Sequence, residues 1–229
     1  MGDGMLADVD GILGGATRVR GDVGRKSSNA LTMTFTTGPD QEVATARQSG
    51  SDGRGRKLGV LLGFKNGGPG IHALTGADGT TIEVESRERQ STLFRSSAGE
   101  PLGEAVRGAP SVVSAADGTV VFTVVPAPDG ATVPPGSRLP DVFRTHLLDA
   151  AGSAFGTLDV IRTLGGWSLG AELAGDVIWF GHAGRALKFP VLGTALTFHR
   201  PPTAQEGDLA LAVCVDAAIG LRPYIPEMD

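Results

Sequence analysis

The sequence contains one cysteine, Cys214, in 229 residues, and this scarcity excludes an internal disulfide framework. Aromatic residues make up only 5% of the chain, and Lys occurs 4 times against 16 Arg. The formal net charge of −5 argues against a general nucleic-acid-binding protein. No hydrophobic run reaches the ~20 residues of a transmembrane helix, and the first residues lack the pattern of a signal peptide. We therefore expect a cytoplasmic protein without a transmembrane segment.

Glycine, in contrast, is abundant. It accounts for 35 of the 229 residues, and these residues are spread without a collagen period. Between them lie short apolar or alternating runs such as 31–37, 58–64, 120–125 and 193–199. Runs of this kind, separated by glycine-rich turns, are typical of β-strands. Counting them predicts ten to twelve strands.

Several of these runs are joined by repeated turn sequences. The sequence Ala-Asp-Gly-Thr occurs at 77–80 and again at 116–119, each time before an alternating run, and Asp-Gly is a strong hairpin signal. A second pattern, Ala-Gly-x-x-apolar-Gly, occurs at 98–103 and 151–156, with a looser copy within 179–189. The repeats predict a series of similar hairpins and suggest an internal duplication.

The most apolar stretch lies near the C-terminus, at 208–221, where eleven of fourteen residues are apolar. A helix that is hydrophobic on all sides must be buried, and this one is too short to span a bilayer. Asp208 is the predicted N-cap. A buried strand around Val213 is the alternative, but the length and the alanines favour a helix. For Asp216, inside the stretch, we expect pairing with Arg222 or a barrel hydroxyl, and not catalysis.

Together these patterns predict a mainly β protein, a closed barrel of about twelve strands around a central C-terminal helix. Closure would remove the exposed edges of so many short strands. The barrel with its helix is assigned to 58–229. Residues 1–57, with one good strand and basic Gly-rich loops, are expected to form part of the same barrel.

The paired hairpins, Trp167-Ser168 between strands and the helix sequence 208–219 resemble the tubby C-terminal-like superfamily, which includes phospholipid scramblases and LURP-one-related proteins. The resemblance covers about 58–222 and rests on pattern. It implies a twelve-stranded barrel around a central helix. It also implies phosphoinositide binding by basic residues, or membrane association with calcium and palmitoylated cysteines. The chain departs here, because it has no Cys-rich segment, no compact acidic calcium loop and no dense basic cluster on the strands.

The basic residues that could hold an anionic headgroup fall in two groups. The denser group is Arg54, Arg56 and Lys57, and the looser one includes Arg18 and Arg20. If both groups met at one barrel rim, they could bind a phosphate together with backbone N–H groups. Solvated loops are the alternative interpretation.

A possible catalytic motif is Gly-Trp-Ser-Leu-Gly at 166–170, which matches the nucleophile elbow of α/β-hydrolases. Asp176 and then His182 or His199 follow Ser168 in triad order. The elbow requires a long helix after the serine, whereas the residues after 170 look like a short strand. A helix of ten or more residues after Ser168 would support a hydrolase, and a strand would remove it.

No metal or cofactor is expected. The four histidines, at positions 72, 146, 182 and 199, show no ligand spacing, and the carboxylates form no calcium loop. Three functional hypotheses follow. The first is a non-enzymatic tubby- or scramblase-like binding or scaffolding protein, with anionic lipid headgroups at the membrane surface as ligand. The second is a small serine hydrolase, and the third is a protein-interaction module.

Overall fold

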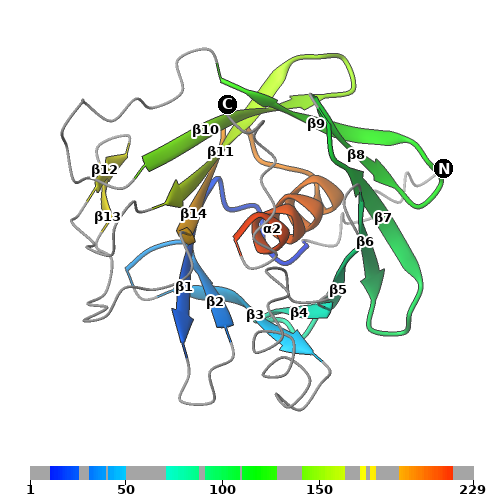
Figure 1. Ribbon diagram of the computed structural model, residues 1–229, viewed down its shortest axis with the longest axis horizontal. Coiled ribbons are helices and arrows are strands. Elements are labelled where there is room, and N and C mark those ends of the chain that lie inside the picture. The colour runs from blue at the N-terminus through cyan, green and yellow to red at the C-terminus, as the bar shows by residue number, and fades with distance from the viewer. Residues whose placement is uncertain are drawn as a thin grey trace, which may run out of the picture.

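The computed structural model describes residues 11–25, 31–39, 41–49, 71–87, 91–108, 110–127, 141–162, 171–173, 176–178 and 191–218. Twelve strands in these ranges form one closed antiparallel barrel, as predicted, and the helix α2 (Ala204–Ala218) lies in its middle (Figure 1). The barrel strands are β1 (Arg18–Arg25), β2 (Leu31–Thr36), β3 (Glu42–Ser49), β4 (Ile71–Gly76), β5 (Thr81–Ser86), β6 (Ser91–Ser96), β7 (Pro101–Val106), β8 (Ser111–Ala115), β9 (Val120–Pro126), β10 (Asp141–Asp149), β11 (Ala154–Arg162) and β14 (Val191–Phe198). A separate two-stranded sheet pairs β12 (Ala171–Leu173) with β13 (Asp176–Ile178).

Around the barrel, nearly every strand pairs with its neighbours in the chain. The exception is β14, which pairs with β11 and closes the sheet on β1. Since β1, β2 and β3 are three of the twelve strands, the first 57 residues and the rest of the chain contribute to one continuous sheet. The segment 58–64, expected to be a strand, lies outside the described residues.

The helix α2 fills the lumen of the barrel. Eight strands already enclose a lumen that side chains alone can fill, so a twelve-stranded barrel needs further material inside. A helix with its side chains, about 10 Å across, supplies it. Twelve of the fifteen residues of α2 are buried, including Leu211, Val213 and Cys214. The all-round hydrophobicity of the sequence is thus explained by contact with strands on every side.

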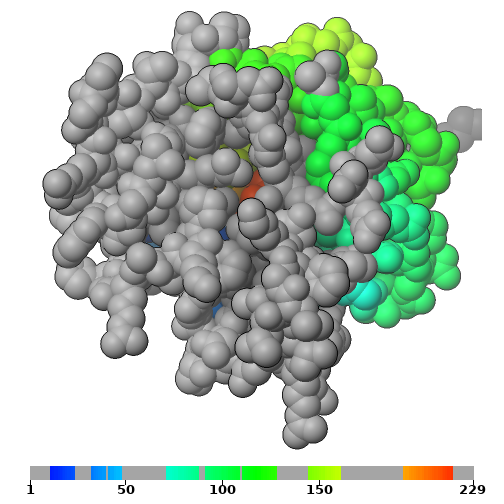
Figure 2. Space-filling view, viewed as in Figure 1, coloured from blue at the N-terminus to red at the C-terminus, as the bar shows by residue number. Residues whose placement is uncertain are grey.

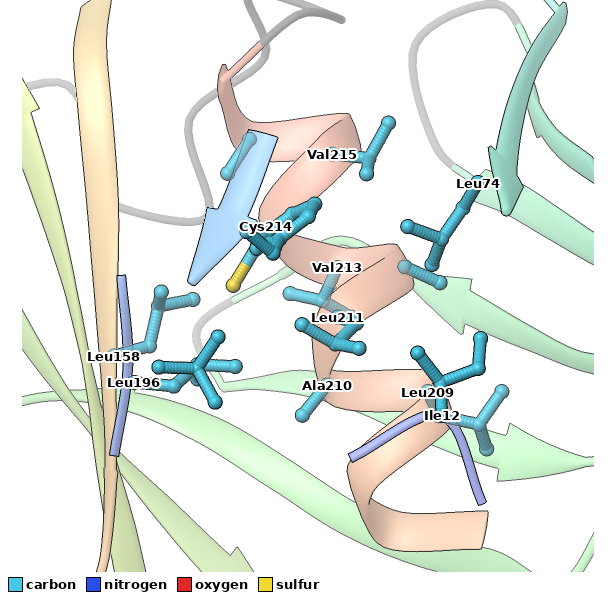
Figure 3. Close-up of a cluster of buried hydrophobic side chains, with 14 of the residues drawn as sticks. Ile12, Leu74, Leu158, Leu196, Leu209, Ala210, Leu211, Val213, Cys214 and Val215 are labelled. Carbon is cyan, nitrogen blue, oxygen red and sulfur yellow. The ribbon is translucent and has the colours of Figure 1, made fainter. Parts of the chain in front are cut away.

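The barrel wall contributes the other half of this core. Burial alternates along the strands, as in β5, where every second residue is buried, so one face of each strand points at the helix. Leu74, Leu158 and Leu196 point inward around α2, and Ile12 lies beside Leu209 at the start of the helix (Figure 3). The outer faces of β6–β9 form one flank of the molecule, green in Figure 2.

The helix begins four residues earlier than predicted. Asp208 is not its N-cap. Thr203 is, because its Oγ1 accepts a hydrogen bond from the Glu206 amide at 3.2 Å, while Glu206 Oε2 accepts one from the Thr203 amide at 2.8 Å. This reciprocal arrangement is a capping box. Asp208 instead accepts a hydrogen bond from the Ile12 amide at 2.8 Å, which ties the chain before β1 to the helix.

The repeated glycines have two separate structural reasons. Gly99 and Gly152, the first of each motif, have φ of 84° and 80°, a conformation that a hairpin turn requires and that side chains disfavour. The second of each motif, Gly103 and Gly156, leaves room for the neighbouring strand. A Cβ on Gly156 would lie 2.8 Å from the Thr197 carbonyl oxygen. Each motif therefore encodes a turn and a close strand contact.

The two ends of the barrel differ in their connections. We call one end the turn rim, because its described strand connections are the short segments 37–41, 77–80, 97–100, 116–119 and 150–153. The residues up to 17 and the link 199–203 also lead into the barrel there. We call the opposite end the loop rim. The segments that join strands there are 26–30, 50–70, 87–90, 107–110, 127–140 and 163–190, and residues 219–229 follow the helix at the same end. Pairing of Ser49 with Ile71 and of Asp141 with Arg162 fixes this assignment.

We predict that Val213→Asp prevents folding of the barrel. Val213 is fully buried against the barrel wall, so the substitution would bury an unpaired charge, at a cost of more than about 4 kcal/mol. Val120, which is 38% exposed on β9, supplies the control Val120→Asp. Circular dichroism and thermal melting should show a folded control and an unfolded core variant. A folded Val213→Asp protein would mean that this side of the helix is not enclosed.

Candidate functional site

The most polar part of the interior surrounds Asp216, near the C-terminal end of α2. Its Oδ1 accepts a hydrogen bond from Ser86 Oγ at 2.9 Å, and its Oδ2 accepts one from Thr92 Oγ1 at 2.8 Å. Arg107 forms a salt bridge with the same Oδ2, at 2.8 Å from Nη2. Arg107 Nη2 also lies 2.5 Å from Thr92 Oγ1 and 3.2 Å from Ser86 Oγ. We call these four residues the Asp216 cluster.

Strand register brings the cluster together. Ser86 is the last residue of β5 and is paired with Thr92 on β6, so both hydroxyls point inward at the loop rim. Arg107 directly follows β7 at the same rim. The side chains of Asp216 and Arg107 are 0% and 9% exposed, so the charges are buried beside one another. The cluster therefore links the helix to β5, to β6 and to the residue that follows β7.

The charge of Arg107 has a specific role here. The C-terminal end of a helix carries partial negative charge, and the last turn of α2 contains no basic residue. Asp216 adds a full negative charge, which would be costly to bury alone. Arg107 supplies the missing positive charge from the barrel wall. Because both hydroxyls donate their protons to Asp216, they act as its hydrogen-bond partners and are not arranged as nucleophiles. We infer that the cluster fixes the depth and rotation of the helix in the barrel.

A second ion pair secures the other end of the helix at the turn rim. Arg200 donates to both carboxylate oxygens of Glu206, at 2.8 and 2.7 Å, and its guanidinium lies 5.0 Å from the ring centroid of Phe155. Burial by itself would raise the pKa of Glu206. The hydrogen bonds from Arg200 and Thr203 outweigh that effect and lower the pKa below its ordinary value.

The connections at the two ends of the barrel differ in the charge of their sequences. The sequence segments at the loop rim contain 12 Lys and Arg against 7 Asp and Glu, a net charge of +5. Those at the turn rim contain one basic residue, Arg200, against seven Asp and Glu, a net charge of −6. The strands and α2 carry the remaining −4 of the total of −5. The basic excess thus belongs to the sequence of the segments that connect strands at the loop rim.

Of the five basic residues that were expected to act together, the structure describes Arg18 and Arg20. Arg18 begins β1 at the turn rim, and Arg20, further along β1, forms a salt bridge with Asp22 at 2.8 Å. Arg54, Arg56 and Lys57 lie outside the described residues, in the segment that joins β3 to β4 at the loop rim. A common headgroup site formed by all five stays a prediction, and the strand ends place Arg18 at the opposite rim from the β3–β4 connection.

The possible hydrolase residues are only partly described. Ser168 and His182 lie outside the described residues, and Asp176 is the first residue of β13. His199 is exposed at the turn rim, just after β14. The strand β12 begins three residues after Ser168, which leaves no room for the helix of ten residues that a nucleophile elbow requires.

The described part of the chain was also compared with the requirements of a metal site and of a membrane-spanning helix. There, no three His, Cys, Asp or Glu side chains are grouped so that they could hold a metal ion. Of the histidines in these ranges, His72 is buried on β4, His146 is partly buried on β10 and His199 is exposed after β14. In the same ranges, no helix combines the length and hydrophobicity needed to cross a membrane.

The sequence predicted only part of the Asp216 cluster. A barrel hydroxyl was expected as partner of Asp216, and two were found, on Ser86 and Thr92. Arg222, the other expected partner, lies outside the described residues. Arg107 was missed, because it is 109 positions from Asp216 and belongs to no motif. The one available signal was its place directly after a strand that ends at the rim.

A scan against protein-family models, a search of the curated proteins and a search of the solved structures each found no match. The resemblance to the tubby C-terminal-like superfamily therefore stays a proposal.

We expect Arg107→Met to destabilise the protein by about 3–5 kcal/mol, because it leaves the Asp216 carboxylate buried without its counter-charge. The double variant Arg107→Met/Asp216→Leu should recover a large part of this loss, since both charges are then absent. Urea unfolding measures each free energy. As a control, Arg20→Met breaks a partly exposed ion pair and should cost at most about 1 kcal/mol. A loss of the same small size for Arg107→Met would contradict the role assigned to the cluster.

The stability of the turn rim should depend on pH through Glu206. Its pKa is lowered in the folded protein, so the stability that its ionised form contributes is present above the ordinary value of 4.5. That contribution is lost as the pH falls from about 4.5 through the folded pKa. Thermal melting of Glu206→Gln should show a weaker decline over this range than the unmodified chain. Burial raises the pKa of Asp208, which contributes the opposite slope in both proteins and cancels in the comparison. Identical pH profiles would show that the Arg200–Glu206 pair adds no stability.

Proposed function

We propose that the protein is a non-enzymatic binding protein of the tubby- and scramblase-like type, which holds anionic lipid headgroups at its loop rim on the cytoplasmic side of a membrane. The observation that carries the proposal is the segregation of charge, +5 in the segments at the loop rim against −6 at the turn rim. A chain with a net charge of −5 that concentrates its basic residues at one end is suited to contact an anionic surface with that end.

The interior supports a rim site over an internal one. The helix α2 occupies the middle of the barrel, and its buried side chains belong to one hydrophobic cluster with those of the wall. The hydrogen-bonding capacity of Ser86 and Thr92 is directed at Asp216. We therefore propose that side chains and backbone N–H groups of the loop-rim connections bind the ligand.

A protein-interaction module would share this fold, but the unequal charge of the rims favours an anionic partner. For an esterase, the short strand β12 after Ser168 supplies no support. Among the basic residues, Arg54, Arg56 and Lys57 are the proposed ligand-binding set, because their segment joins strands at the loop rim.

Vesicle cosedimentation tests the proposal, with neutral and phosphoinositide-containing vesicles at two salt concentrations. Basic residues near an anionic surface contribute about 1 kcal/mol each, so Arg54→Ala/Arg56→Ala/Lys57→Ala should weaken binding by about a hundredfold. Higher salt should weaken binding of the unmodified chain through screening.

The matched control is Arg18→Ala/Arg20→Ala, which also removes positive charge, but at and near the turn rim. It should bind anionic vesicles like the unmodified protein. Equal loss in both variants would indicate a response to net charge alone. Absence of binding to anionic vesicles, or equal binding to neutral ones, would refute the lipid proposal.

A further inference from the structure

We infer that residues 11–16, which precede β1, form a plug at the turn rim that opens while the barrel stays folded, and that the negative charge of Asp208 favours the open state. We call these residues the N-terminal plug. The plug lies at the rim opposite to the proposed lipid site, and its opening requires no lipid.

The backbone of the plug takes no part in the sheet. Two of its hydrogen bonds, at 2.8 and 3.0 Å, lie within the plug itself. In the described part of the chain, its backbone link to the helix is the Ile12 amide, which donates to Asp208 Oδ1 at 2.8 Å. Contact with β14 begins at Thr17, whose carbonyl oxygen accepts a hydrogen bond from the Phe198 amide at 2.7 Å. The plug can therefore leave the barrel without breaking a strand pairing.

Two apolar side chains hold the plug against the barrel. Ile12 and Leu13 are 7% and 5% exposed and belong to the hydrophobic core. Both pack against glycines, since a Cβ added to Gly207 in α2 would lie 3.0 Å from Leu13 Cδ1, and one added to Gly76 in β4 would lie 3.1 Å from Ile12 Cγ1. Burial of two side chains must offset the conformational entropy of ordering six residues. The plug is therefore less stable than the barrel, whose strands are paired on both sides.

A pair of glycines separates the buried part of the plug from β1. Gly14 and Gly15 have φ of 53° and 79°, and a Cβ added to either would have no atom within 4 Å beyond its chain neighbours. Glycine adopts this and many other backbone conformations at little cost. The pair is therefore the hinge about which Ile12 and Leu13 leave the barrel, while Thr17 and β1 keep their place.

The negative charge of Asp208 destabilises the closed plug. The plug backbone covers this carboxylate, since a Cβ added to Gly11 would lie 2.7 Å from its Oδ1. Burial raises the pKa of Asp208, the hydrogen bond from Ile12 lowers it, and the negative charge of Asp78, in the turn between β4 and β5, raises it again. The net direction is a raised pKa, so the closed state disfavours the ionised form. Opening returns water to the carboxylate, and ionisation therefore favours the open plug.

Amide hydrogen exchange, measured by NMR at one neutral pH, tests whether the plug opens on its own. The Ile12 and Ala16 amides are hydrogen-bonded in the closed plug, whereas the Val213 amide lies inside α2, whose first turns Ile12 adjoins beside Leu209 (Figure 3). Amides of a segment that opens locally exchange faster than amides that require global unfolding. After correction for intrinsic rates, we expect Ile12 and Ala16 to exchange at least about a hundredfold faster than Val213, and at rates similar to one another.

The variant Asp208→Asn tests the role of the charge, because it keeps an oxygen acceptor for the Ile12 amide and removes the carboxylate. It should slow exchange of both Ile12 and Ala16 by at least about threefold. Ala16 is the informative amide, since its hydrogen bond goes to the Leu13 carbonyl and not to Asp208. The control Asp117→Asn removes a carboxylate at the same rim that accepts a hydrogen bond within its own turn, so it should leave both rates unchanged.

Each contrary outcome overturns a defined part of the inference. Exchange of Ile12 and Ala16 at the rate of Val213 would show that the plug opens only when the barrel unfolds. Slower exchange of Ile12 alone in Asp208→Asn would reflect one stronger hydrogen bond and contradict opening of the plug as a unit. Unchanged or faster exchange in that variant, or an equal response to Asp117→Asn, would refute the role of the Asp208 charge. None of these measurements involves vesicles, so the proposed function is tested separately.

Discussion

The width of a twelve-stranded barrel is the constraint on which the rest of the structure depends. A lumen of this size cannot be filled by side chains from the wall alone, and the helix α2 supplies the missing volume. Small residues such as Ala210, Ala212 and Cys214, all buried, let the helix lie within the ring of strands. The barrel and the helix therefore require one another, because the helix would expose apolar surface on all sides without the wall.

A helix with such a uniform surface needs polar contacts to fix its position, because apolar packing alone discriminates poorly between rotations and depths. These contacts lie at its two ends. At the turn rim, the capping box and the Arg200–Glu206 pair fix the first turn. At the loop rim, Arg107 and two hydroxyls fix Asp216 near the last turn. We infer that the buried charges fix the depth and rotation of the helix, a role that buried polar groups have in some coiled coils.

The sequence predicted features that depend on residues close together in the chain, and it failed for contacts between residues far apart in the chain. The hairpins at 77–80 and 116–119 were correctly placed, because turn chemistry is local. The central helix followed from the composition of one continuous stretch. The start of the helix was missed because Asp208, a good capping residue, serves the chain before β1, while Thr203 caps the helix. Arg107 could not be found, since its partner is brought to it only by barrel closure.

Closure of the barrel also limits which surfaces can bind a partner. A sheet without free edges and a lumen occupied by α2 leave the outer face and the two rims as surfaces for a partner. The turn rim is formed by tight hairpins with acidic residues such as Asp78 and Asp117, whose side chains accept hydrogen bonds from Thr80 and Thr119 within their own turns. At the loop rim, the segments that connect the strands are long and basic in sequence. In a chain that is acidic as a whole, the folding of the barrel does not require this difference in charge between the two sets of connecting sequences, and the proposed binding function rests on it.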